Sequence, residues 1–175
     1  AHVDHVDLKE KQRFDLHDLG DRLSGAQMIN EEAGYHLWGT SPIIGEDGKV
    51  HLFTARWPTH KDKPKNGFTP YWRLEGEIAH YVGDSETGPF KFSDVAAKSL
   101  SKDFMSPHNC TIHKSGDTFV LIFIVNKGGT DQRIIMYLSD SVYGPWRPAG
   151  SESGKDGTVV DSSGDPGIWS HKTYN

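Results

Sequence analysis

Residues 78–90 read IAHYVGDSETGPF, and residues 134–146 repeat the same frame as IIMYLSDSVYGPW. The shared pattern is I-x-x-Y-x-x-D-S-x-x-G-P followed by an aromatic residue, so that Ile134 takes the place of Ile78. Upstream, TSPII at 40–44 corresponds to HNCTI at 108–112, so that His108-Asn109 takes the place of Thr40-Ser41. Self-similarity at this spacing in β-rich segments is typical of propeller blades. We therefore predict an all-β propeller of which this chain supplies about two four-stranded blades.

Eight strands are expected, four in each blade. The turn EDGK at 46–49 joins the first two strands of blade 1, because Asp-Gly supplies the positive φ of a tight hairpin. In blade 2, FVLIFIV at 119–125 is continuously apolar, which predicts a strand buried on both faces. The expected strands are Trp38–Ile44, Val50–Trp57, Glu77–Gly83 and Phe90–Ser93, then 108–113, 117–125, 133–139 and 146–149.

The segments on either side of the two blades are polar and lack this strand pattern. We predict an N-terminal arm over 1–35, blade 1 over 36–95, blade 2 over 96–150 and a linker towards a missing blade over 151–175. A propeller needs about four or more blades to close, and two blades alone leave apolar faces and strand edges uncovered. We therefore expect a further chain or the remaining blades to complete the fold, and no stable fold for this chain alone.

Composition narrows the classes of function. Of 175 residues, 35% are hydrophobic and 25% charged, as in a soluble globular protein. The formal net charge of −5 argues against a nucleic-acid partner, and no apolar run reaches the roughly 20 residues that span a bilayer. The single Cys110 excludes a disulfide framework within the chain and a multi-cysteine zinc site. The ten histidines show no close metal-ligand spacing, so we expect no cofactor; a single axial ion such as calcium, held by His108 and water, stays open.

One long stretch resembles a known family. WGTSPIIGEDGKVHLFTARWP at 38–58 looks like the first blade of five-bladed propeller glycosidases similar to glycoside hydrolase family 43 and its fructosidase-type relatives. The likeness continues in PHNCTIHK at 107–114 and in both D-S-x-x-G-P frames, so that it covers about 38–149. It implies a five-bladed β-propeller, a glycoside hydrolase that acts on an oligosaccharide or polysaccharide in an axial pocket, and a secreted or periplasmic protein of bacterial type.

The acidic residues of that family are missing at two positions. In the family, an Asp opening the first inner strand is the general base, a second Asp on the next inner strand tunes pKa, and a later Glu is the general acid. Here the corresponding positions hold Thr40-Ser41 and His108-Asn109, and the blade that would carry the general acid is not one of these two. Two alternatives stay open: a polysaccharide lyase that uses His and Arg on a uronate-containing glycan, and a non-catalytic sugar-binding propeller.

Eight residues are predicted to form the site, because polar groups at the openings of inner and third strands face the axis. Glu77 is a candidate proton donor, and His108 a proton shuttle, since imidazole titrates near neutral pH. The structural alternatives are a Glu77 tie to Arg56 or Arg73, and a His108 ring satisfied by backbone. Predicted to bind substrate are Trp38, Ser41, Arg56, Trp57, Asn109 and Arg133, with core or inter-blade packing as the alternative for both Trp residues.

The two D-S-x-x-G-P frames are interpreted as architecture. Asp84 and Asp140 suit a turn that caps the outer hairpin of each blade, and Gly88 and Gly144 supply the backbone freedom that such a turn requires.

Overall fold

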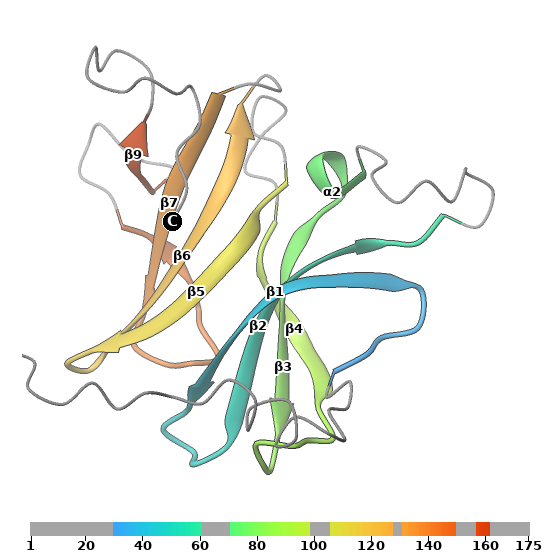
Figure 1. Cartoon of the computed structure of the whole chain (residues 1–175). Coiled ribbons are helices and arrows are strands. Elements are labelled where there is room, and N and C mark those ends of the chain that lie inside the picture. Colours follow the sequence, from blue (N-terminus) through green and yellow to red (C-terminus); the bar gives the residue numbers. More distant parts are fainter. Residues whose placement is uncertain (1–29, 61–70, 99–105, 128–130, 150–156, 162–175) are drawn as a thin grey trace, which may run out of the picture.

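The computed structural model describes residues 30–60, 71–98, 106–127, 131–149 and 157–161 (Figure 1). Most of the N-terminal arm and most of the linker predicted at the two ends lie outside the described residues.

Two antiparallel sheets make up the described part of the chain. The first has the strand order β1 (Tyr35–Ile44), β2 (Val50–Pro58), β3 (Glu77–Gly83) and β4 (Lys91–Ala97). The second has the order β5 (His108–Ser115), β6 (Thr118–Lys127), β7 (Asp131–Ser139) and β8 (Arg147–Pro148). All eight expected strands are present, in chain order across each sheet. The prediction of an all-β fold with two four-stranded units is confirmed, and α2 (Tyr71–Leu74) adds one helical turn.

The first strands of the two sheets lie next to each other. The Ile112 N–H donates a hydrogen bond of 3.1 Å to Ser41 Oγ, and Cys110 Sγ lies 3.7 Å from the Gly39 carbonyl oxygen. From this common edge of β1 and β5 the sheets splay apart, as neighbouring propeller blades do (Figure 1). The order from inner to outer strand within each blade is therefore as predicted.

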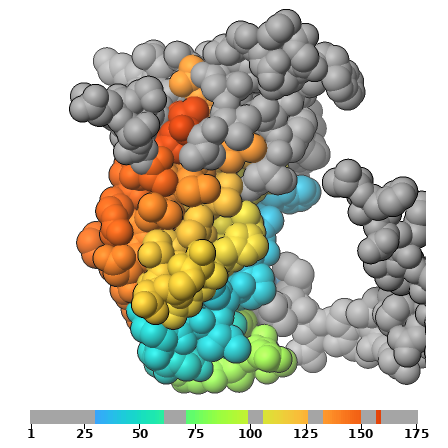
Figure 2. Space-filling model, turned by 90° about the vertical axis from the view of Figure 1, so that its left-hand side faces the viewer, coloured from blue at the N-terminus to red at the C-terminus, as the bar shows by residue number. Residues whose placement is uncertain are grey.

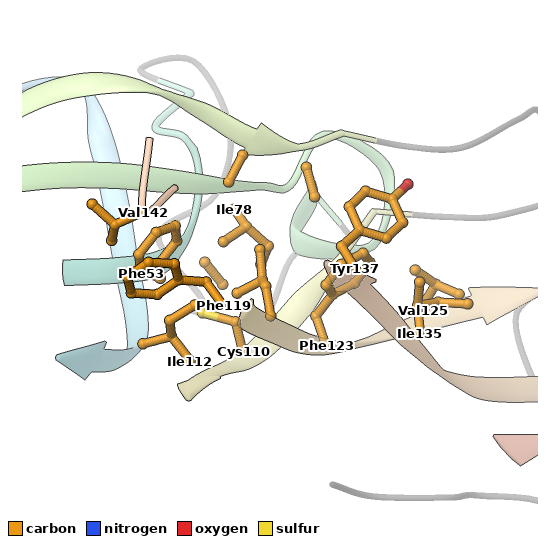
Figure 3. Packing of buried hydrophobic residues seen from close by; sticks show 14 residues of the cluster. Phe53, Ile78, Cys110, Ile112, Phe119, Phe123, Val125, Ile135, Tyr137 and Val142 are labelled. Carbon is orange, nitrogen blue, oxygen red and sulfur yellow. The ribbon is translucent and has the colours of Figure 1, made fainter. Parts of the chain in front are cut away.

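The main hydrophobic core fills the space between the two sheets. Phe53 and Ile78 come from the first sheet, and Phe119, Phe123 and Ile135 come from the second (Figure 3). All five are at most 1% exposed. From the side, the cyan residues of the first sheet lie directly below the yellow and orange residues of the second in one continuous surface (Figure 2). Burial of aromatic and branched side chains on this scale is the dominant force that joins the blades.

The D-S-x-x-G-P frames form matching turns, as predicted. Gly88 and Gly144 have φ of 78° and 87°, which only glycine adopts readily. Ser85 Oγ donates a hydrogen bond of 2.8 Å to the Gly88 carbonyl, and the following Gly-Pro peptide bonds, at 88–89 and 144–145, are both cis.

The outer strand of the second sheet is interrupted, which the sequence pattern did not predict. β8 pairs with one end of β7, and β9 (Thr158–Asp161) pairs with the other end along the same side. Between them the Ala149 N–H bonds to the Met136 carbonyl, and the Met136 N–H bonds to the Gly157 carbonyl, each at 2.8 Å. The ladder is thus continuous across an insertion, and part of the region predicted as a linker belongs to blade 2.

Strand pairing corrects the alignment of the two inner strands. Trp38 pairs with Ala55 and His108 with Ile124, and each strand then carries a bulge before the next pair. Within the bulges, Gly39 has φ of 61° and Asn109 has φ of 47°. His108-Asn109 therefore corresponds to Trp38-Gly39. The alignment that matched His108-Asn109 to Thr40-Ser41 was wrong, because it compared polar side chains and ignored the backbone bulge.

The alignment of the third strands holds. Glu77 pairs with Arg56 at the start of β3, and Arg133 pairs with Val125 near the start of β7. These two pairs occupy equivalent places in their sheets, as the repeat of the D-S-x-x-G-P frame predicts.

Candidate functional site

Several of the predicted site residues lie toward the same end of the two sheets. Strands β1, β3, β5 and β7 all begin at the end where α2 lies (Figure 1). The openings, meaning the first four residues of each strand, contain Trp38 in β1, Glu77 in β3, His108 in β5 and Arg133 in β7. This shared end follows from the antiparallel order, in which every second strand runs in the same direction.

His108 is held in place by α2 and by the chain just before β5. Its ring is 7% exposed and meets the Trp72 ring edge to face, with centroids 4.9 Å apart. Its Nδ1 lies 3.3 Å from the Ser106 carbonyl oxygen, so Nδ1 carries the hydrogen and Nε2 is the acceptor nitrogen. Burial lowers the pKa of His108 below its ordinary value, and nearby Arg73 acts in the same direction. A neutral imidazole of this kind is suited to accept a proton.

The support beneath His108 depends on close backbone contact. The Gly76 N–H donates a hydrogen bond of 2.8 Å to Ser106 Oγ, and the Ser106 N–H bonds to the Arg73 carbonyl at 2.9 Å. A Cβ on Gly76 would come within 2.8 Å of the Trp72 carbonyl oxygen and 2.9 Å of Ser106 Cβ. Sequence reasoning singled out none of Trp72, Gly76 and Ser106 as part of the site, and only the clustering of Trp72 with Gly76 before a predicted strand could have pointed to them.

Glu77 and Arg56 form a tie on the face of the first sheet that points away from the second sheet. Arg56 is 4% exposed, and its Nε and Nη2 lie 2.8 and 2.7 Å from Glu77 Oε1. Nη1 contacts Glu32, which also accepts a hydrogen bond from Tyr81. Although burial opposes the charge, these hydrogen bonds raise the pKa of Arg56. The structural alternative, a Glu77–Arg56 tie, is therefore the observed arrangement.

The Arg56 guanidinium is also enclosed by aromatic rings. Its Cζ lies 4.3 Å from the centroid of the Tyr35 ring and 4.1 Å from that of Phe92. With two carboxylates and two rings around it, Arg56 has little capacity left for a substrate. No contact in the described part of the chain joins Glu77 to His108, so their joint role stays a prediction.

The remaining predicted residues differ widely in exposure. Trp38 is 59% exposed at the opening of β1, which leaves its indole ring available for stacking. Asn109, whose side chain lies against Gly39, is half-buried in the bulge. Ser41 accepts the inter-sheet hydrogen bond from Ile112 and so has a structural role. Trp57 is half-buried with its ring 5.7 Å from that of His36, and Arg133 pairs opposite Val125 at the start of β7.

Neither a metal-binding cluster nor a membrane-spanning helix is found in the part of the chain that the structure describes. These contain no group of three or more His, Cys, Asp or Glu residues arranged to hold a metal ion. No helix within the described residues is long and apolar enough to cross a bilayer.

Comparison with known proteins identifies the fold. No family model matches the chain, and no curated protein matches it either. Among solved structures it resembles a family 117 glycoside hydrolase of the marine bacterium Zobellia galactanivorans, with 19% identity and a TM-score of 0.57 over 80% of this chain and 43% of that one. It also resembles the beta-xylosidase RS223 (14% identity, TM-score 0.52, 65% and 35% of the two chains).

A third similar structure is a family 43 beta-xylosidase/alpha-arabinofuranosidase from a compost microbial metagenome, solved with xylotriose (17% identity, TM-score 0.51). The match covers 66% of this chain and 34% of that one. The chain thus spans less than half the length of each of these three structures. Its two four-stranded sheets have the fold of part of a five-bladed propeller of the glycosidase type.

Proposed function

We propose that this chain is part of a glycoside hydrolase that binds an oligosaccharide or polysaccharide at the end of the sheets where β1 and β5 open. The supporting observation is that the openings of the two inner strands place an exposed Trp38 and a buried, neutral His108 at equivalent positions. An indole ring stacks on the apolar face of a sugar, and an imidazole exchanges protons with a hydroxyl group. The fold shared with glycosidases adds to this argument but does not by itself imply the activity.

Glycoside hydrolysis needs acidic groups that the openings of the two inner strands do not supply. Glycoside hydrolysis uses two carboxylic groups on opposite sides of the bond. The corrected register puts Trp38-Gly39 and His108-Asn109 at the inner openings, and neither pair is acidic. The acidic pair then comes from outside these two openings, and His108 positions or deprotonates a substrate hydroxyl through its acceptor nitrogen Nε2.

A polysaccharide lyase is the second candidate, because a neutral His108 is the kind of base that elimination requires. The arginine that would neutralise a uronate is then Arg73 or Arg133, since Arg56 already binds Glu32 and Glu77. A binding module without catalysis is the third outcome.

Product analysis on a panel of neutral and uronate-containing polysaccharides distinguishes the three, with the complete protein as the sample. New reducing ends without ultraviolet absorbance support the hydrolase, an absorbing unsaturated product supports the lyase, and unaltered polymer with measurable binding supports the module. His108→Ala should lower turnover about 100-fold, as loss of a proton-transfer group does. His113→Ala, on the exposed end of the same strand, is the matched control and should leave turnover unchanged. Equal activity of both variants would refute the role of His108.

A further inference from the structure

Two buried histidines form a continuous hydrogen-bonded chain between two carboxylates. His51 Nε2 lies 3.0 Å from Asp47 Oδ1, His51 Nδ1 lies 2.7 Å from His80 Nε2, and His80 Nδ1 lies 3.2 Å from Asp94 Oδ2. Both imidazole rings are 0% exposed, and they stack with centroids 5.0 Å apart. His80 in turn stacks on Phe53, a residue of the main core.

The number of hydrogens available to these four side chains indicates which protonation state satisfies all their hydrogen bonds. Three contacts between nitrogen or carboxylate atoms need three hydrogens, whereas two neutral imidazoles carry only two. With two hydrogens, a lone pair faces another lone pair at one of the three contacts. With four, two N–H groups face each other between His51 and His80. Only the state with one extra proton makes all three hydrogen bonds, and a buried polar chain is costly unless it is fully satisfied.

The proton belongs to the imidazoles rather than to the carboxylates. Although burial opposes ionisation, hydrogen bonds from His51, the Lys49 N–H and Tyr143 hold the pKa of Asp47 well below its usual range. Burial also raises the pKa of Asp94, but hydrogen bonds from His80 and Ser93 outweigh it and hold this pKa below its usual range. Both carboxylates are therefore anions at neutral pH.

The chain of groups continues into the second blade. Tyr143, on the turn between β7 and β8, donates a hydrogen bond of 2.7 Å to Asp47 Oδ2, and its ring packs edge to face on His51 at 5.0 Å. Beside it, Glu46 accepts hydrogen bonds from Ser141 Oγ at 2.6 Å and from the Val142 N–H at 3.2 Å. The turn between β1 and β2 thus binds the D-S-x-x-G-P turn of blade 2. These contacts are called the joint between the two blades.

The other charged groups near this joint have partners of their own. Lys49, on the same turn, pairs with Asp84 at 3.1 Å. Hydrogen bonds from Ser141 and the Val142 N–H, opposed by burial, lower the pKa of Glu46. The hydrogen bond to Asp47 raises the pKa of Tyr143 to about 12, so this hydroxyl keeps its hydrogen at neutral pH. None of these groups therefore supplies the third hydrogen of the Asp47–His51–His80–Asp94 chain.

We propose that His51 and His80 share one extra proton, and that this proton makes the joint between the two blades sensitive to pH. Loss of the proton breaks one of the three hydrogen bonds, at Asp47 next to Tyr143, at Asp94, or between the rings. Uptake of a second proton sets two N–H groups against each other. All three hydrogen bonds therefore form only while the pair carries one extra proton.

The direction on the alkaline side follows from linkage. In the unfolded chain, ordinary histidines are neutral above about pH 6.5, whereas the proposed folded pair carries one extra proton. The native state then binds one more proton than the unfolded state, so stability falls as pH rises. The unfolding equilibrium constant should increase up to about tenfold per pH unit above about pH 6.5, for as long as the folded pair keeps its proton.

The second blade supplies a matched apolar control. By strand register, Val120 occupies the position of His51 and Met136 the position of His80. The double variant H51V/H80M therefore places at these positions the residues that the second blade carries there. Urea unfolding between about pH 6 and pH 9, on the assembly in which the protein is purified, should show the steep dependence in the wild type and a flatter one in the variant. The remaining histidines are common to both proteins, so that their contribution cancels in the difference.

A direct measurement covers the case in which the variant does not assemble. In protein labelled with ¹⁵N at histidine, the wild-type ring nitrogens of His51 and His80 should show three bound hydrogens for the pair at pH 7. Two neutral imidazoles in that spectrum would overturn the proposal, and so would the same pH dependence of unfolding in wild type and H51V/H80M.

Discussion

Glu77→Gln should destabilise the protein by about 2 kcal/mol, because Glu77 neutralises a buried guanidinium. Breaking a fully buried ion pair costs about 3–5 kcal/mol when it leaves a charge uncompensated. Here the cost is smaller, since Glu32 still contacts Nη1 of Arg56 after the substitution. A hydrogen bond to a charged group contributes about 1.5–3 kcal/mol, which sets the expected loss. The melting temperature of the assembly in which the protein is purified should fall accordingly.

Thermal unfolding and turnover, measured on the same preparations, test this account of Glu77. Glu75→Gln is the matched control, because the Glu75 carboxylate is 39% exposed and pairs with the partly exposed His60. Its effect on stability should stay within about 0.5 kcal/mol. A Glu77→Gln variant that melts like wild type but has lost activity would show that Glu77 is the proton donor of the alternative interpretation and not a tie.

Three further outcomes are expected. The isolated chain should not sediment as a monodisperse, cooperatively melting monomer, because two blades leave sheet faces and edges uncovered; such a monomer would refute this. The Cys110 thiol, whose pKa burial raises to about 12, should stay unreactive towards a thiol reagent at pH 8 until the protein unfolds, and rapid labelling of native protein would contradict its burial. The lowered pKa of Asp94 contributes stability that is present above the ordinary pKa of Asp and lost as pH falls through the folded value, so Asp94→Asn should flatten the acid limb of a pH–stability curve, and an unchanged limb would count against it.

The repeat predicted the fold because turn chemistry and strand pattern are local. The positive φ at positions 88 and 144 requires glycine. The pattern of apolar residues that precedes each of these turns defines the strand. The alignment of β1 with β5 was harder to predict, because a bulge adds residues to a strand without changing its pattern of polar and apolar residues. Asn is among the residues that best tolerate positive φ, so matching Asn109 with Gly39 was the available signal.

The site was less predictable, because it depends on which groups face each other across strands. The spacing of Arg56 and Glu77 along the chain does not indicate that they pair directly between β2 and β3. A search for histidines spaced closely in sequence likewise misses His51 and His80, which meet diagonally because Phe53 pairs with His80 and His51 with Val82. Such neighbours follow from register, which becomes known only when the strands are paired.

The two blades use equivalent faces in chemically different ways, and this difference makes their joint selective. The aliphatic pair Val120 and Met136 would fit many apolar surfaces, whereas His51 and His80 fit a neighbour that presents a hydroxyl group to Asp47. Tyr143 meets that need, while the equivalent residue of the first blade is Thr87, whose side chain is too short to reach across. A buried polar chain adds little net stability over an apolar one, but it penalises a wrong partner by leaving charges unpaired. The contacts at the joint between blades 1 and 2 therefore favour blade 2, rather than another blade, as the neighbour of blade 1. Apolar packing alone would not make this distinction.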